Sequence, residues 1–322
     1  MLDGFGRTVD YLRISVTDRC NLRCVYCMPE DGTAWTPHER ILRYEDILRL
    51  CGIFVSLGVR NFRITGGEPL VRKGLPALAA GIKAIPGAER VALTTNGVML
   101  AEALPALLDA GIDGINFSLD TLDRERFAAL TRRDMLPQAL RGLDAVLKAP
   151  GLTLKLNCVA ASGSERDWLA LAAIAREHPV AVRFIEAMPI GLGRTLEFCG
   201  EAAVRKALEK AYGEAAPCAA PLGSGPARYV SFPGFAGSVG FISALSHRFC
   251  GGCNRVRLTA AGFLKTCLQY DAGVDLAPLL GDGDETLREA IRDAILRKPE
   301  AHQFQNAAVP HSEGRIMSQI GG

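Results

Sequence analysis

The chain has 322 residues, a formal net charge of +2 and a hydrophobic fraction of 48%. That length suits one large α/β domain or one domain with an appendage. Lysine plus arginine (37) nearly balances aspartate plus glutamate (35), which excludes a global charge signal for nucleic acid or membrane binding and leaves only a local anion site.

The sequence predicts a chain that stays in the cytoplasm. No stretch approaches about 20 uninterrupted apolar residues, and residues 1–19 carry charges throughout, so we expect neither a membrane span nor a signal peptide. Disulfides are rare in a reducing compartment. Clustered cysteines among the ten present therefore indicate metal binding or catalysis.

From residue 11 to about 187, short β-like runs alternate with helical stretches. The expected strands are 11–16, 60–65, 90–95, 113–118, 152–159 and 180–187. The expected helices are 44–57, 75–84, 101–110, 123–148 and 166–177. This alternation predicts parallel strands in βαβ units. Periodicity alone leaves open whether six such strands form a Rossmann-type sheet or part of a barrel.

The pattern changes after residue 190. A helix is expected at 201–212, and the Pro/Gly-rich passage 217–240 is interpreted as a boundary or an irregular connection. A compact cysteine segment follows at 250–267, then a helix at 284–297 and an irregular tail from about 299. We therefore predict two domains, 1–216 and 217–322.

The first cysteine group follows the first expected strand. Cys20, Cys24 and Cys27 stand in CNLRCVYC, and three thiolates this close favour an iron–sulfur cluster or zinc. A four-iron cluster with three cysteine ligands keeps one iron open for a substrate or cofactor. The alternative is a zinc site completed by a distant ligand such as His38, although this spacing differs from the paired C-x₂-C of zinc ribbons.

Polar residues gather where the expected strands end. The second strand ends in Thr65-Gly66-Gly67-Glu68-Pro69, whose glycines allow backbone to approach a ligand closely. In a parallel barrel, ligand chemistry concentrates at the C-terminal ends of the strands. The same rim would carry Thr94, Thr95, Asn96, Ser118, Asp120 and Met188. Each is also explicable as an ordinary turn or helix cap.

A second cysteine group lies near the C-terminus. Cys250, Cys253 and Cys267 have the spacing C-x₂-C-x₁₃-C, so three ligands are again close together and a fourth is missing. A zinc knuckle completed by His247 is the alternative. Arg255 and Arg257 would project to one face of an extended strand.

Several basic residues fall within expected strands. Buried arginine is unfavourable unless it meets an anion, and guanidinium groups pair well with phosphate oxygens. A solvated strand end or an internal salt bridge would explain any single one. The residues are Arg13, Arg63, Lys155 and Arg183.

The motif CNLRCVYC, followed one βα unit later by GGEP, resembles the signature of radical S-adenosylmethionine enzymes. In that family, the open iron binds the amino and carboxylate groups of S-adenosylmethionine, whose reductive cleavage yields a 5′-deoxyadenosyl radical. The resemblance implies a [4Fe-4S] cluster on Cys20, Cys24 and Cys27. It also implies S-adenosylmethionine contacts from Tyr26, Gly67, Ser118 and Met188.

The whole chain resembles more narrowly the bacterial GTP 3′,8-cyclases of molybdenum-cofactor biosynthesis. The resemblance is densest at GRTVDYLRISVTDRCNLRCVYCMP, RITGGEPL, LTTNG, RFIEAMP, CGGCNRVRLT and the terminal IGG. It implies a second [4Fe-4S] cluster on Cys250, Cys253 and Cys267, with one iron free for guanine. The implied GTP-binding residues are Arg13, Arg63, Thr94, Lys155, Arg255, Val256 and Arg257.

Catalytic roles are also implied by the resemblance. They fall on Arg183 and on the terminal Gly321 and Gly322, because the tail of the family enters the active-site cavity. A frayed tail is the simpler interpretation. The remaining thiols match no ligand position and are interpreted as core or incidental cysteines. They are Cys51, Cys158, Cys199 and Cys218.

The resemblance implies an incomplete (β/α)₆ TIM-like barrel, closed at one side by a C-terminal α/β extension that carries the second cluster. The implied reaction converts GTP to (8S)-3′,8-cyclo-7,8-dihydroguanosine 5′-triphosphate. Expected partners are an electron donor, transiently the next enzyme of the pathway (cyclic pyranopterin monophosphate synthase), and a second copy in a homodimer. Two alternatives remain: a radical enzyme that modifies peptides, and a non-catalytic iron–sulfur or zinc protein.

Overall fold

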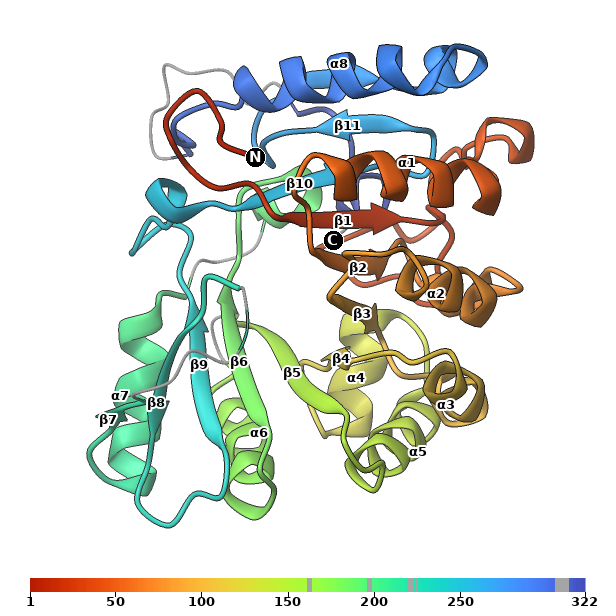
Figure 1. The fold of residues 1–322 in the computed structure, drawn as a ribbon. Coiled ribbons are helices and arrows are strands. Elements are labelled where there is room, and N and C mark those ends of the chain that lie inside the picture. The colour runs from red at the N-terminus through yellow and green to blue at the C-terminus, as the bar shows by residue number, and fades with distance from the viewer. Residues whose placement is uncertain (161–163, 196–198, 219–222, 224, 305–312, 322) are drawn as a thin grey trace.

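A computed structural model describes the chain except residues 161–163, 196–198, 219–222, 224, 305–312 and 322. Its strands form one twelve-stranded sheet in the order β12-β11-β10-β1-β2-β3-β4-β5-β6-β9-β8-β7. The run from β10 to β9 is parallel throughout, and an antiparallel pair extends it at each edge. Figure 1 shows the helices on the outside of this curved sheet.

The N-terminal part contains six strands joined by helices, with two helices between β4 and β5. Its strands are β1 (Tyr11–Ser15), β2 (Asn61–Thr65), β3 (Arg90–Thr95), β4 (Gly114–Ser118), β5 (Thr153–Ala160) and β6 (Ala181–Glu186). Its helices are α1 (Tyr44–Ser56), α2 (Leu75–Lys83), α3 (Leu100–Asp109), α4 (Arg124–Thr131), α5 (Leu136–Leu147) and α6 (Glu165–Glu177). The expected partial-barrel class is confirmed, and every expected strand is present within two residues of its predicted ends.

The C-terminal part adds helices and both sheet edges. Its strands are β7 (Ala216–Pro217), β8 (Arg228–Ser231), β9 (Ser238–Ile242), β10 (Arg255–Leu258), β11 (Phe263–Lys265) and β12 (Gly273–Asp275). Its helices are α7 (Glu201–Tyr212), α8 (Asp284–Leu296) and α9 (Met317–Ile320). Short 3₁₀ turns η1 to η5 cover His38–Arg40, Pro69–Val71, Gly191–Thr195, Cys250–Gly252 and Ala277–Gly281.

Two expectations were wrong in detail. The helix predicted over 123–148 is two helices, because Arg132 adopts a left-handed conformation (φ 54°) between α4 and α5. Residues 217–240 are not merely a connection, since β8 and the start of β9 lie there. The extension joins both edges of the six-stranded part: β9 pairs with β6, and β10 pairs with β1. The predicted division at 216 stays a prediction.

Alternation along the strands separates a core from a polar inner face. On β1, Leu12 and Ile14 are fully buried in the hydrophobic core beneath the helices, whereas Tyr11 and Arg13 line the cavity. The same period of two recurs on the other parallel strands. Core residues of this kind include Phe62, Ile64, Val91, Leu93, Ile115, Phe117, Leu154, Leu156, Val182, Phe184, Val256 and Leu258. The inner face is therefore free to carry functional side chains.

In the part of the chain that the structure describes, we find no helix with the length and apolar character that a membrane crossing requires. The longest helices, including α1 and α8, have 13 residues.

Candidate active site

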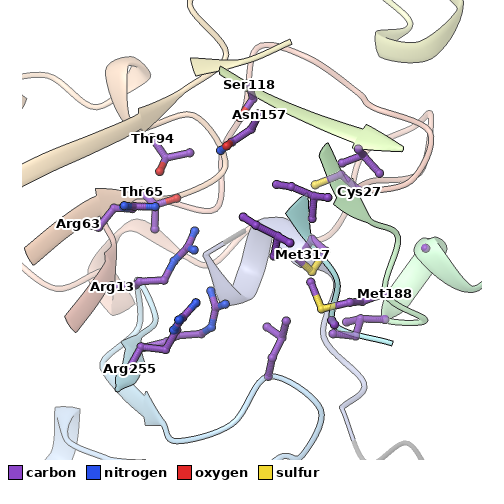
Figure 2. A pocket seen from close by; sticks show the side chains of 18 of the residues that line it. Arg13, Cys27, Arg63, Thr65, Thr94, Ser118, Asn157, Met188, Arg255 and Met317 are labelled. Atoms are coloured by element: carbon purple, nitrogen blue, oxygen red, sulfur yellow. The ribbon is translucent and has the colours of Figure 1, made fainter. Parts of the chain in front are cut away.

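The candidate site is a cavity of about 360 Å³ on the inner face of the sheet. Both cysteine groups line it, together with arginines from β1, β2, β6 and β10. Figure 2 shows Arg13, Arg63 and Arg255 on one side of this space, facing Cys27 and Met188 on the other. The structure thus brings together residues that lie more than 200 positions apart in the sequence.

The loop after β1 carries the first cysteine set. It is held from outside by the turn between α4 and α5: the backbone amide of Arg23 donates to Thr131 O (2.9 Å), and Arg132 Nη1 donates to Met28 O (2.9 Å). Burial raises the pKa of the Cys20 thiol to about 11 and that of the Cys27 thiol to about 12. Without a bound metal these thiols keep their protons, so cluster binding must displace them.

The GGEP turn rests directly on that cysteine loop. The amide of Gly67 donates to Thr17 O (2.7 Å), and the amide of Glu68 donates to Arg19 O (2.8 Å). A Cβ atom on Gly67 would lie 2.4 Å from Arg19 O. Glycine is therefore required because backbone packs on backbone here.

Glu68 is buried behind this turn. Its carboxylate accepts from Thr95 Oγ1 (2.8 Å) and from the amides of Asn96 (2.8 Å) and Leu70 (3.0 Å). Burial nevertheless raises its pKa to about 7. Glu68 thus ties the end of β2 to the end of β3 and fixes the rim of the cavity.

The other cofactor-site candidates lie along the same rim. Tyr26 Oη donates to Asp120 Oδ2 at 2.5 Å, and Asp120 Oδ1 accepts from the amide of Val159 (2.8 Å). Burial raises the pKa of both side chains. Ser118 and Met188 line the cavity at the ends of β4 and β6. The predicted rim of polar residues is present.

The second cysteine set lies at the opposite end of the cavity. Cys250 begins the 3₁₀ turn η4 and Cys253 follows it, whereas Cys267 stands after β11. Burial raises the pKa of Cys250. Burial also disfavours the Cys253 thiolate, but the charges of Lys298 and Arg255 outweigh it, and the pKa of Cys253 is lowered.

Three arginines stand side by side on adjacent strands. Arg13 is in register with Arg63 on β2 and with Arg257 on β10. Burial lowers the pKa of Arg13 and that of Arg257, the latter to about 10, and the neighbouring guanidinium charges add to the effect. Arg255 lies two residues before Arg257 on β10, and its guanidinium lies over the ring of Phe249. Such a concentration of positive charge is suited to an anion.

Two further cations continue this surface. Arg183 is 2% exposed and donates to Asn157 Oδ1 (2.8 Å) and Asn116 Oδ1 (2.6 Å). Lys155 lines a smaller adjoining hollow, which also contains Arg63. Burial, followed by repulsion from Arg183 and Arg63, lowers the pKa of Lys155 to about 7.

The remaining substrate candidates are placed differently. Thr94 lines the main cavity, and its buried Oγ1 has no hydrogen-bond partner among the described residues. Val256 is 1% exposed and packs in the hydrophobic core between the two arginines of β10. Any contact of Val256 with substrate would therefore involve its backbone.

The C-terminal tail enters the cavity. Ser318 donates its amide to the Cys27 thiol, and the carbonyl oxygen of Gly321 accepts from Arg257 Nη1 (2.7 Å). Ile320 packs with Ile190 and Phe304 in a small apolar cluster. The tail thus contacts both the first cysteine loop and the arginine row. Gly322, the other expected catalytic glycine, lies outside the described residues.

Sequence reasoning missed some residues of the site. Asn116 and Asn157, which hold Arg183, fall on the inner face by strand alternation, so this pattern was available as a signal. Lys298, which contacts Cys253 Sγ at 3.4 Å, stands just beyond α8, and no motif marked it.

The two cysteine sets have the ligands that iron–sulfur clusters require. All six candidate ligands are free thiols that line one cavity, three at each end. Within the described ranges, no three His, Cys, Asp or Glu side chains are grouped to hold a single metal ion. A cluster is larger than one ion and separates its ligands more widely, so each set of three soft thiol ligands fits a cluster.

Two family models match this chain. Residues 14–179 match the Radical SAM superfamily, and residues 180–304 match Molybdenum Cofactor Synthesis C. Curated proteins named GTP 3′,8-cyclase from Pelotomaculum thermopropionicum and Heliobacterium modesticaldum are each 44% identical to it, with all of both chains covered. The chain belongs to the GTP 3′,8-cyclase family. Membership of the radical S-adenosylmethionine superfamily implies the use of that cofactor and an iron–sulfur cluster.

A solved structure supports the fold. Streptococcus suis SuiB bound to S-adenosylmethionine has a TM-score of 0.64 and 13% identity, and the match covers 90% of this chain and 68% of that one. At this identity the likeness establishes the partial-barrel architecture alone.

The close packing at Gly67 yields the first prediction. Gly67→Ala should lower the free energy of unfolding by roughly 1–3 kcal/mol, because the new Cβ meets backbone that cannot rotate away. It should also lower the iron content, since the Thr17–Arg19 segment leads into the first cysteine set. Urea unfolding and iron analysis measure the two effects. Gly281→Ala is the control, because nothing lies within 4 Å of its Cβ position and it is outside both cysteine sets; equal behaviour of the two variants would contradict the prediction.

Proposed function

We propose that this chain converts GTP to (8S)-3′,8-cyclo-7,8-dihydroguanosine 5′-triphosphate, the first step of molybdenum-cofactor biosynthesis. One observation carries the proposal: two cysteine sets and a row of partly buried arginines line the same cavity. Relatives named GTP 3′,8-cyclase that align along the whole chain support it. A metal-binding protein without a substrate would not need the arginine row.

Each cysteine set would hold one [4Fe-4S] cluster. Cys20, Cys24 and Cys27 would hold the cluster that binds S-adenosylmethionine, which supplies a 5′-deoxyadenosyl radical when reduced. Cys250, Cys253 and Cys267 would hold the second, whose free iron would take the guanine. The first set follows the C-terminal end of β1, and Cys250 and Cys253 precede its parallel neighbour β10, so the substrate would lie between the two sets.

The rim residues would bind S-adenosylmethionine. Gly67 would present backbone where no side chain fits, and Tyr26 would offer its ring to the adenine while Asp120 holds its hydroxyl. Ser118 and Met188 would complete this end of the cavity.

The cationic inner face would bind the triphosphate of GTP. After burial, the charges of Arg257 and Arg63 lower the pKa of Arg13, and an anion between the three would offset their repulsion. Further contacts are proposed for Thr94, Lys155, Arg255 and the backbone of Val256. Arg183 would be oriented by its two asparagine partners.

The tail would shield and shape the reaction space. A primary carbon radical reacts with most groups that it meets, so water and stray side chains must be excluded. Gly321 places only backbone beside Ser15 and Thr65, and Arg257 holds its carbonyl oxygen. We propose that Gly321 and Gly322 position the substrate or an arginine without adding bulk.

Some expectations stay predictions: the electron donor, transient contact with the next enzyme, the homodimer and the cytoplasmic location. Among the residues that the structure describes, no specific contact favours a peptide-modifying enzyme or a non-catalytic metal protein over the cyclase.

Anaerobic turnover with GTP, S-adenosylmethionine and a reductant, followed by mass analysis of the nucleotide, tests the function. The parent protein should contain about eight iron atoms per chain and form the cyclised product. Cys24→Ala should abolish cleavage of S-adenosylmethionine and keep the second cluster. Cys267→Ala should abolish GTP cyclisation and keep the electron paramagnetic resonance signal of the first cluster. Continued GTP turnover by Cys267→Ala would refute the substrate-binding role of the second set.

The low pKa of Lys155 predicts a pH-dependent affinity for GTP. With a pKa of about 7 in the free protein, Lys155 loses its charge above pH 7, and an anion favours the charged form. GTP affinity should therefore fall as pH rises from 7 to 9, by up to roughly tenfold per pH unit. Calorimetry in buffers of different ionisation enthalpy should detect proton uptake at pH 8.

Lys155→Arg is the control for this prediction, because a guanidinium stays charged over that pH range. Lys155→Arg should bind GTP with little pH dependence, and Lys155→Met should bind weakly at every pH. The same pH profile in Lys155→Met as in the parent would assign the titration to another group.

Gly321→Ala tests the tail. Gly321 has φ +74°, and a Cβ would lie 3.1 Å from Ser15 Cβ and 3.2 Å from Thr65 Cγ2, so alanine should displace the tail. We expect at least tenfold less cyclised product with near-normal 5′-deoxyadenosine formation. Gly314→Ala, whose Cβ position is open, should behave as the parent does. Full cyclisation by Gly321→Ala would show that the tail has no role in the reaction.

A further inference from the structure

Lys298 is a buried cation at the second cysteine set. It follows α8 and is 3% exposed. Its ammonium donates to Cys253 Sγ (3.4 Å), Arg255 O (3.1 Å) and Thr266 O (2.7 Å). Three acceptors match the three protons of a charged lysine, so the group is held in one orientation.

These contacts join the separate parts of the second set. Arg255 lies two residues after Cys253, and Thr266 lies immediately before Cys267. A single ammonium therefore bridges the turn η4 and the segment after β11, which together carry the candidate ligands. Lys298 fixes their spacing and places a positive charge among them.

The charge of Lys298 is not matched by a carboxylate. Among the described residues, no Asp or Glu forms a salt bridge with it, and its oxygen partners are both neutral carbonyls. Burying an ammonium is unfavourable unless negative charge offsets it. Its remaining partner is the sulfur of Cys253, which would be a thiolate once it ligates a cluster and would then supply negative charge together with that cluster.

The first cysteine set has a different environment. Cys20 Sγ lies 3.9 Å from Asn96 Nδ2 and 3.4 Å from the amide of Leu22, and Cys27 accepts from the amide of Ser318. These donors are neutral. The cation at this set, Arg23, donates to the carbonyl oxygens of Cys20 and Leu22. The hydrogen bond from a cation to a candidate ligand sulfur thus distinguishes the second set, and the first set serves as an internal reference.

We propose that Lys298 is a positioning residue that raises the reduction potential of the cluster held by Cys250, Cys253 and Cys267. This inference rests on the proposed function. Reduction takes one electron from an external one-electron reductant and adds one negative charge to the cluster and its thiolates. A fixed cation in contact with a ligating sulfur stabilises that added charge, since hydrogen bonds to sulfur and local charge set cluster potentials.

The test is a reductive titration of the intact holoprotein, followed by electron paramagnetic resonance. The variants are Lys298→Met, Lys298→Gln and Lys298→Arg, each also made with Cys24→Ala so that the second cluster is observed alone. The neutral variants should lower the ratio of reduced to oxidised second cluster at least tenfold at a fixed potential, a shift of about 59 mV for one electron. Lys298→Arg should keep the parent potential.

Two references accompany the titration. The potential of the first cluster should not change in any Lys298 variant. Lys148→Met removes an exposed lysine that pairs with Asp144 on α5, and should shift neither cluster. Iron analysis of every protein reports cluster loss separately from a change in potential.

Each outcome decides the inference. Full iron content with an unchanged potential in Lys298→Met and Lys298→Gln would overturn it and leave the proposed function intact. Loss of the second cluster in all three variants, Lys298→Arg included, would also overturn it in favour of a purely structural role. Loss in the two neutral variants alone would support the requirement for charge. A parent protein with only about four iron atoms per chain would refute the second cluster itself.

Discussion

The repulsion among guanidinium groups on the inner face is the constraint on which the rest of the structure depends. Arg257, Arg13 and Arg63 occupy one row across three adjacent strands, where burial and mutual charge depress pKa values. A fold can keep such a row only if its outer face supplies enough apolar burial. Strand alternation supplies it, since Leu12 and Phe62 enter the core from those same strands.

The same constraint gives the two ends of the cavity distinct characters. At the first cysteine set, neutral amides and a tyrosine held by Asp120 surround the thiols. At the second set, Lys298 and Arg255 bring positive charge to Cys253. The proposed nucleotide-binding surface and the proposed second cluster site therefore lie in one continuous region of positive charge. The tail connects the first cysteine set with the arginine row, because Ser318 contacts Cys27 and Gly321 contacts Arg257.

Local pattern predicted most of this architecture, and its failures have physical causes. The strand at 90–95 was predicted to the residue, because Val91 and Leu93 face the core while Ala92 and Thr94 face the cavities. The break between α4 and α5 escaped prediction because Arg132 takes a left-handed conformation that its identity does not signal. Residues 217–240 looked irregular because glycine and proline dominate them, yet pairing with β6 makes a strand of Ser238–Ile242. Tertiary pairing overrides local propensity at such places.

The attachment of the C-terminal part to both edges of the sheet has a consequence for how the protein is made. β1 pairs with β10, and β6 pairs with β9. In each pair, the first strand is synthesised before the second, so it is without this neighbour until the later strand leaves the ribosome. Pairings between distant segments form slowly, because the intervening chain must first lose its freedom. The first cysteine loop is therefore synthesised long before the residues that cover it. For that interval its thiols are open to whatever delivers iron and sulfide, and equally to oxidants, and the arrival of β10 and the tail ends the exposure.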